Sequence, residues 1–142
     1  MRQSVSRPER GDDPRPAIVE LRIPAVPEFV GVARLAAAGI ATRLDFSIED
    51  IEDLKLAVAE ACNCCIQNGG TGDVHITCEV HRDRIVIVVE RSGALEPVRA
   101  TSEDAELGGL GVFLIRALMD DVTYVADPAS GTKLTLVKHL GK

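Results

Sequence analysis

A single acidic residue, Glu60, stands among small apolar residues in the segment AVAEACNCC, and its carboxylate is the first candidate for chemistry in this chain. Apolar residues recur at spacings of three and four through residues 50–68, which predicts one long amphipathic helix. Glu60 lies off the apolar stripe, on the edge that it shares with Asn63 and Cys64. An acid at such a place is either a solvated helix residue or the working group of a cleft. The stripe consists of Ile51, Leu54, Val58, Ala61 and Cys65.

A second candidate for chemistry is the glycine-rich turn Gly108-Gly109-Leu110-Gly111, which runs directly into the amphipathic segment VFLIRALMDD. A glycine-rich turn that opens a helix presents backbone N–H groups to an anion, and the helix dipole favours negative charge there. An ordinary helix-entry turn has the same local pattern. The turn by itself therefore does not decide whether an anion binds here.

The cysteines form a third group, because three of the four lie close together at Cys62, Cys64 and Cys65. Cys62 and Cys65 have the C-x-x-C spacing, but they fall in the middle of the expected helix. A reactive pair is typical of a helix N-terminus, and a zinc site needs four ligands, for which the chain offers no obvious set. We therefore predict packed thiols here and at Cys78.

The composition limits the possible functions. The chain has 142 residues, which suits one domain, and a net charge of −6, which argues against a nucleic-acid binder. No apolar run approaches the roughly 20 residues that span a bilayer, and no signal-peptide pattern is present. We expect a cytoplasmic protein without a membrane or nucleic-acid partner, with a disordered tail at residues 1–16 and one domain at 17–142.

The order of the elements that must position these residues is β-α-α-β-β-loop-α-β-β, which predicts an α+β two-layer sandwich. Its sheet is expected to be mixed but mostly antiparallel, with three helices on one face. The strand at 84–90 is apolar on both faces and should lie centrally. In the helix at 28–43, the expected buried stripe is Phe29, Val32, Leu35, Ala36, Gly39 and Ile40. The remaining strands are expected at 17–23, 73–80, 122–126 and 132–138.

Four blocks, IPAVPEFVGVARLAAAGIATRL, IEDLKLAVAEAC, GGLGVFLIRALMDDV and GTKLTL, occur in the order found in one known family. In these blocks the chain resembles the bacterial anti-sigma factor serine/threonine kinases of the general-stress type. That family belongs to the histidine-kinase-like ATPase superfamily, which also includes gyrase and MutL. The resemblance covers about residues 18–140.

The resemblance implies a homodimer that binds an alternative sigma factor and uses ATP and magnesium to phosphorylate a serine of an anti-anti-sigma partner. It implies that Glu60 is the general base and that Gly108, Gly109 and Gly111 wrap the phosphates. It also places Gly93, Gly131 and Thr132 near the adenine.

Two positions depart from the family pattern. The asparagine that holds magnesium falls on Cys64, a soft ligand, with Asn63 beside it as an imperfect substitute. The aspartate that accepts the adenine amino group falls on Arg91, which has donors only, and Glu90 projects to the other strand face. Three hypotheses stay open: a working kinase, a non-catalytic partner-binding module, or a regulator that binds another nucleotide such as one with guanine.

Overall fold

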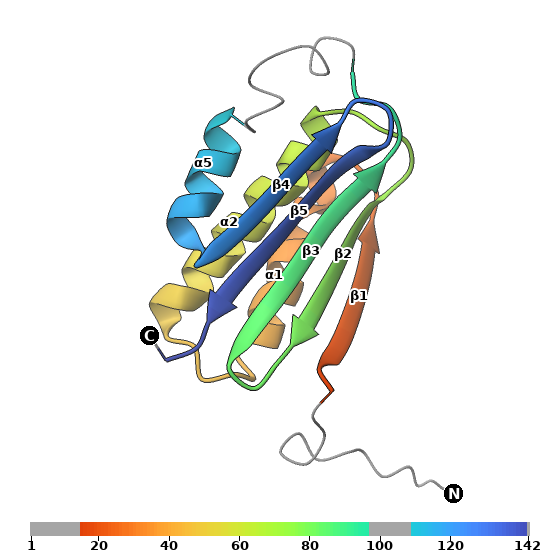
Figure 1. The fold of residues 1–142 in the computed structure, drawn as a ribbon. Helices are drawn as coiled ribbons and strands as arrows, with labels where there is room; N and C mark the ends of the chain where they lie inside the picture. Colours follow the sequence, from red (N-terminus) through yellow and green to blue (C-terminus); the bar gives the residue numbers. More distant parts are fainter. Residues whose placement is uncertain (1–14, 97–108, 142) are drawn as a thin grey trace, which may run out of the picture.

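The structure, a computed structural model, describes residues 15–96 and 109–141. In these stretches five strands form one sheet in the order β1-β2-β3-β5-β4, and the helices cover one of its faces (Figure 1). The α+β two-layer sandwich is therefore confirmed. The expected mixed character is not, because all four strand pairings are antiparallel. The strands are β1 (Ala17–Ile23), β2 (Val74–Val80), β3 (Arg84–Ser92), β4 (Asp121–Asp127) and β5 (Gly131–His139); the helices are η1 (Pro27–Phe29), α1 (Val30–Ala41), α2 (Ile48–Gln67) and α5 (Gly109–Leu118).

Strand β3 is the third of the five strands, as its apolar sequence predicted. Ile85, Ile87 and Val89 point toward the helices and are fully buried. They pack with Leu134 and Leu136 of β5, so the centre of the core lies between these two strands and α2. The core is aliphatic, and α2 crosses its middle.

Helix α2 lies where the sequence predicted it, beginning two residues before and ending one residue before the expected range 50–68. Ser47 is the N-cap, and its hydroxyl accepts a hydrogen bond of 3.0 Å from the Asp50 N–H. After the C-cap residue Asn68, Gly69 adopts a φ of +88°, which suits glycine and stops the helix. The predicted stripe is buried except for Ile51, which is partly exposed.

The prediction of the buried stripe on α1 was wrong for four of its six residues. Phe29, Val32 and Leu35 are 43%, 46% and 71% exposed and Gly39 is also exposed, whereas Ala36 and Ile40 are partly buried. Apart from Arg34 this helix is apolar all round, so periodicity could not choose its buried face. The face that packs on α2 is the one rich in alanine, because small side chains let the two helices approach closely. The residues that α1 buries are Val30, Ala33, Ala37 and Ala41.

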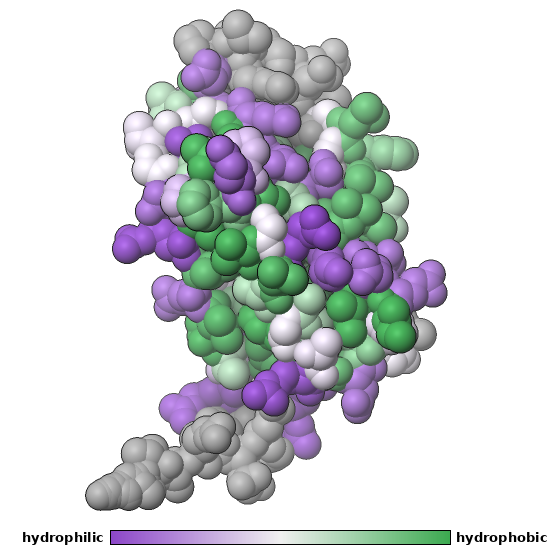
Figure 2. All heavy atoms as spheres, turned by 180° about the vertical axis from the view of Figure 1, so that it is seen from behind, coloured by the Kyte–Doolittle hydropathy of each residue, from purple (hydrophilic) through white to green (hydrophobic). Residues whose placement is uncertain are grey.

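Seen from the helical side, apolar side chains are spread widely over the surface (Figure 2). No helix within residues 15–96 and 109–141 is long and apolar enough to cross a membrane. The expected tail lies outside the described residues, apart from Arg15 and Pro16.

A buried lysine closes the end of the molecule where α2 begins. Lys138 is 8% exposed, and its ammonium donates to the Leu118 carbonyl at the end of α5 over 2.6 Å. It also lies 3.7 Å from the carboxylates of both Asp50 and Asp53. One cation therefore joins the end of α5, the first turns of α2 and β5, and its charge complements the carbonyl end of the α5 dipole.

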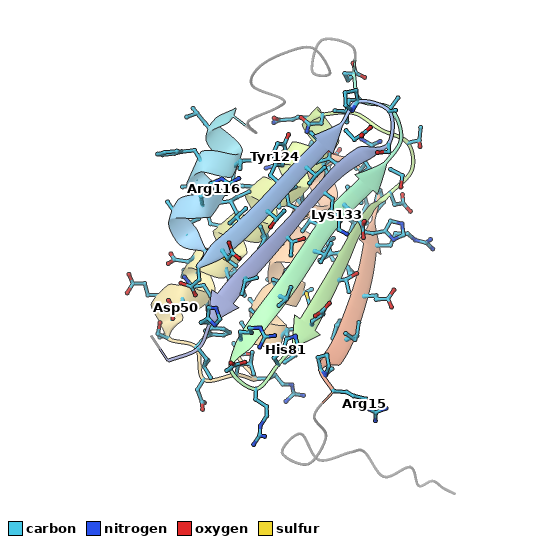
Figure 3. All side chains as sticks on the ribbon, viewed as in Figure 1. Arg15, Asp50, His81, Arg116, Tyr124 and Lys133 are labelled. Atoms are coloured by element: carbon cyan, nitrogen blue, oxygen red, sulfur yellow. The ribbon has the colours of Figure 1, made fainter. Side chains whose placement is uncertain are left out.

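We predict that Lys138→Met destabilises the protein by about 1–3 kcal/mol, because the aspartates and the Leu118 carbonyl lose their common partner. Urea unfolding measures the change. Lys133→Met, at an exposed position of the same strand (Figure 3), is the matched control and should change stability little. Equal effects of the two substitutions would contradict a stabilising role for Lys138.

Candidate functional site

Glu60 lies against the start of α5, as the hypothesis of a cleft requires. It is partly exposed on α2, and a Cβ added to Gly111 would lie 3.4 Å from its Oε1 atom. Glycine at position 111 therefore leaves room beside the carboxylate. Gly109 has a φ of +60°, a left-handed conformation that glycine adopts without strain. Gly108 lies outside the described residues.

This arrangement brings a carboxylate to the first turn of a helix whose leading N–H groups lack partners within the helix. Such N–H groups bind anions, and the helix dipole adds to their effect. An anion at this position would lie beside Glu60. The arrangement can therefore place a proton acceptor next to a bound phosphate.

Asn63 and Cys64 differ in their surroundings. Asn63 is partly exposed one turn after Glu60, whereas Cys64 is 9% exposed and belongs to the core. The Cys64 sulfur lies 3.8 Å from the Asn68 amide nitrogen. Cys64 therefore faces the interior and packs against a polar cluster at the end of α2.

The centre of that cluster is Asn68, whose importance the sequence analysis missed. Its side-chain Nδ2 atom donates to the hydroxyls of Tyr124 (3.0 Å) and Thr132 (3.2 Å). Its backbone carbonyl accepts a hydrogen bond from the Glu96 N–H (2.9 Å). Asn68 is 3% exposed and Thr132 is 2% exposed. Tyr124 extends from β4, next to β5 (Figure 3). One side chain and its backbone thus connect α2, β4, β5 and the segment after β3.

Burial raises the pKa of the Tyr124 phenol to about 12, so its hydroxyl stays protonated at neutral pH. The sequence held one weak signal for this residue, since it is the only tyrosine of the chain. Asn68 looked like an ordinary helix end before two glycines. Nothing in the local sequence connects the two residues.

Arg91 lies opposite Thr132 in the pairing of β3 with β5, at the same end of the site. Its Nε atom donates to the Gly72 carbonyl over 3.1 Å, and its aliphatic stem covers Gly70. The side chain therefore fastens the loop that follows α2. The alternating burial of β3 puts Glu90 on the other face, as predicted.

Two glycines are required by close backbone contacts at this end. Gly93 has a φ of +103°, and a Cβ there would lie 2.5 Å from the Thr71 nitrogen. Gly131 has a φ of +128°, and a Cβ there would overlap the Arg91 carbonyl. Both positions match glycines that the family resemblance singled out, and both have a backbone reason to be glycine.

The side chains of this site suit the phosphates and magnesium of a bound nucleotide better than they suit its adenine base. Glu60 and Asn63 offer oxygen ligands, and Mg²⁺ needs only one or two from protein because water and phosphate supply the others. Cys64 offers a soft sulfur that faces inward. Arg91 offers donors to a base and no acceptor.

The four cysteines are free and buried, in agreement with the prediction of packed thiols. Burial raises the pKa of Cys62 to about 12 and that of Cys78 to about 11, and it also raises the pKa of Cys65. Among the described residues, no group of three or more His, Cys, Asp or Glu side chains could hold a metal ion.

We predict that Asn68→Ala destabilises the protein by about 1–3 kcal/mol, because the partly buried Tyr124 hydroxyl and the buried Thr132 hydroxyl each lose a hydrogen bond. In a double-mutant cycle with Tyr124→Phe, measured by urea unfolding, the coupling energy should be about 1 kcal/mol. Asn63→Ala, on the same helix, is the control. Simple additivity of the two changes would show that the hydrogen bond adds nothing to stability.

We also predict that the native thiols react slowly with iodoacetamide at pH 8, because only the thiolate is nucleophilic and a raised pKa keeps the thiol protonated. Unfolding in guanidinium should expose all four. Ala129→Cys, in the exposed turn before β5, should add one fast-reacting thiol. Fast labelling of the unmodified native protein, followed by mass spectrometry, would argue against buried, inert thiols.

The comparisons with known proteins agree with this geometry. Residues 23–138 match the histidine kinase-like ATPase domain family. The serine-protein kinase RsbW of Halalkalibacterium halodurans is 39% identical over 142 residues, covering 89% of this chain and 85% of the relative. RsbW of Listeria innocua is 39% identical (87% and 88% covered), and RsbW of Bacillus subtilis is 33% identical (86% and 85% covered). The chain belongs to the histidine kinase-like ATPase domain family, among the relatives of the serine-protein kinases RsbW.

Proposed function

We propose that this chain is an anti-sigma regulatory protein that acts as an ATP-dependent serine protein kinase. The observation that carries the proposal is the Glu60 carboxylate beside Gly111, at the first turn of α5. From there it can accept the proton of a serine hydroxyl while backbone N–H groups hold the phosphoryl group that is transferred. The name serine-protein kinase, borne by the relatives, supports this activity.

The proposed cofactors are ATP and magnesium. Gly108, Gly109 and Gly111 would surround the phosphates, and Asn63 would supply an amide oxygen to the metal. Bound magnesium would offset the negative charge of the phosphates. Cys64 would stand beside the metal in place of the family's asparagine. At the other end, Thr132 and Gly93 would border the base, with Arg91 in place of the family's aspartate.

The proposed partners follow from the family resemblance. The chain would sequester an alternative sigma factor and phosphorylate an anti-anti-sigma protein, acting as a homodimer in the cytoplasm. The extent of the similarity supports these partners. The alignments with the relatives cover more than four fifths of this chain and more than four fifths of each relative.

A second candidate is a partner-binding module without turnover. Two observations favour it: the Cys64 sulfur packs against the amide of Asn68, and Arg91 donates to the Gly72 carbonyl. Neither residue offers what the family uses to hold magnesium or adenine. Partner binding would not depend on either.

We predict that the chain binds Mg-ATP weakly in a calorimetric titration and that Cys64→Asn with Arg91→Asp raises the affinity ten- to a hundredfold. A carboxylate would restore an acceptor for the adenine amino group, and a hydrogen bond to a charged group contributes about 1.5–3 kcal/mol. A parallel titration with Mg-GTP tests recognition of guanine. Tight binding of Mg-ATP by the unmodified chain would contradict the second candidate, because that module is supposed to have lost nucleotide binding.

The kinase itself is tested by transfer of the γ-phosphate to the cognate anti-anti-sigma protein. Glu60→Gln keeps the shape of the side chain but cannot accept the proton, so transfer should fall at least about a hundredfold with Mg-ATP binding kept. Glu52→Gln, on an exposed turn of the same helix, is the matched control. Absence of transfer by the unmodified chain, with partner binding intact, would favour the binding module.

A further inference from the structure

The side-chain amide of Asn68 is only half used by the protein. Its Nδ2 atom donates to the hydroxyls of Tyr124 and Thr132 and lies 3.8 Å from the Cys64 sulfur. Its Oδ1 atom has no hydrogen-bond partner among residues 15–96 and 109–141, although Asn68 is 3% exposed. Buried polar atoms are nearly always paired, because an unpaired one has lost its bond to water. This acceptor therefore indicates a partner that the described residues do not supply.

The amide lies at the end of the site where the base of a nucleotide is expected. Thr132, whose hydroxyl is 3.2 Å from the Asn68 Nδ2 atom, pairs with Arg91 across β5 and β3. The Asn68 backbone carbonyl accepts from the N–H of Glu96, three residues after Gly93. In the proposed function, Thr132 and Gly93 border the base. The unpaired acceptor thus belongs to the group of residues that would surround it.

An acceptor is what this end of the site needs. Arg91 stands where the family has an aspartate, and a guanidinium group can only donate. Its Nε atom donates to the Gly72 carbonyl, which holds the side chain over the loop after α2. Adenine requires both kinds of partner, because its amino group donates while its ring nitrogens accept. A side chain other than Arg91 must therefore receive the amino group.

We propose that Asn68 is the residue that selects adenine in this chain, its Oδ1 atom accepting a hydrogen bond from the exocyclic amino group of the base. An amide oxygen is a neutral acceptor, so this bond is weaker than one to a carboxylate, which is consistent with weak binding of Mg-ATP. The same atom disfavours bases with an oxo group at that position, because two acceptors would face each other without a proton between them. The inference rests on the proposed function, since it requires a nucleotide in this site.

The hydroxyls of Tyr124 and Thr132 hold the amide in place before a ligand arrives, so little conformational freedom is lost on binding. Turning the amide by 180° would exchange its two ends and present the NH₂ group, since a hydroxyl can donate as well as accept. The two orientations predict opposite preferences. An available Oδ1 atom favours the amino group of adenine, whereas an available Nδ2 atom favours an oxo group. The preferred base therefore reports which atom of Asn68 is available.

The test compares two nucleotides that differ at the base alone. Mg-ATP and Mg-ITP carry the same ribose and phosphates, but inosine has an oxo group where adenosine has the amino group. Their affinities are measured by displacement of a fluorescent nucleotide, trinitrophenyl-ATP, from the unmodified chain. Mg-ATP should bind about tenfold or more tightly than Mg-ITP. Equal affinities, or a preference for Mg-ITP, would overturn the proposal.

Three variants separate recognition from a purely structural role. Asn68→Leu removes the acceptor, so the affinity for Mg-ATP should fall about tenfold and the preference over Mg-ITP should disappear. Asn68→Asp keeps an oxygen acceptor at this position, so the preference should remain. Tyr124→Phe is the matched control, because it removes one of the same hydrogen bonds but leaves Oδ1 in place. Urea unfolding shows which variants are folded. Should Asn68→Leu not fold, loss of the preference in Asn68→Asp would still contradict the proposal.

The outcomes also separate this inference from the proposed kinase. Phosphate transfer by a chain that binds Mg-ATP and Mg-ITP equally would keep the kinase and overturn the role of Asn68. A preference for Mg-ATP that depends on Asn68, without phosphate transfer, would keep that role and refute the kinase. Displacement by neither nucleotide would overturn the inference and favour the partner-binding module.

The side-chain amide itself gives a direct readout by NMR. In ¹⁵N-labelled protein, the NH₂ signals of Asn68 are those that Asn68→Asp removes. Saturating Mg-ATP should shift these signals more than Mg-ITP does, because a hydrogen bond to Oδ1 polarises the amide. The side-chain amide of Asn63, which is partly exposed one turn after Glu60, is the control and should respond equally to both nucleotides. Equal shifts at Asn68 would contradict the proposed bond to the amino group.

Discussion

The buried hydrogen bonds of Asn68 are the constraint on which the geometry of this site depends. A buried amide that loses its partners is costly at low dielectric, so the bonds to Tyr124 and Thr132 fix where α2 ends relative to β4 and β5. The Asn68 carbonyl also anchors the segment after β3 through the Glu96 N–H. Glu60 lies eight residues earlier, about two helical turns, so the same bonds help to set its position against α5.

Periodicity predicted helix α2, whose apolar residues recur at spacings of three and four, and the unbroken apolar run of β3 predicted a central strand. Both elements lie where the sequence indicated. The placement of Glu60 beside Gly111 brings together residues about fifty positions apart, and no pattern of either segment predicts it. The family resemblance supplied that expectation, and the packing of α2 against α5 agrees with it.

Two features were beyond sequence reasoning for physical reasons. Helix α1 is apolar all round apart from Arg34, so its buried face depends on how closely its alanines approach α2, which is a tertiary effect. The cluster of Asn68, Tyr124 and Thr132 joins residues 56 and 64 positions apart. A hydrogen bond over such separations leaves no local signature, and each residue alone has an ordinary explanation.

The two departures from the family pattern are accommodated by the structure in different ways. Arg91 bonds the Gly72 carbonyl and covers Gly70, and Cys64 packs against the Asn68 amide, so neither leaves an isolated polar group in the core. Their cost to folding is therefore small, and their effect falls on recognition of the ligand. Glu60, one turn before Cys64 on α2, keeps its place beside the start of α5. The two departures therefore change the groups offered to the metal and to the base, while the proton acceptor of the proposed function stays in place.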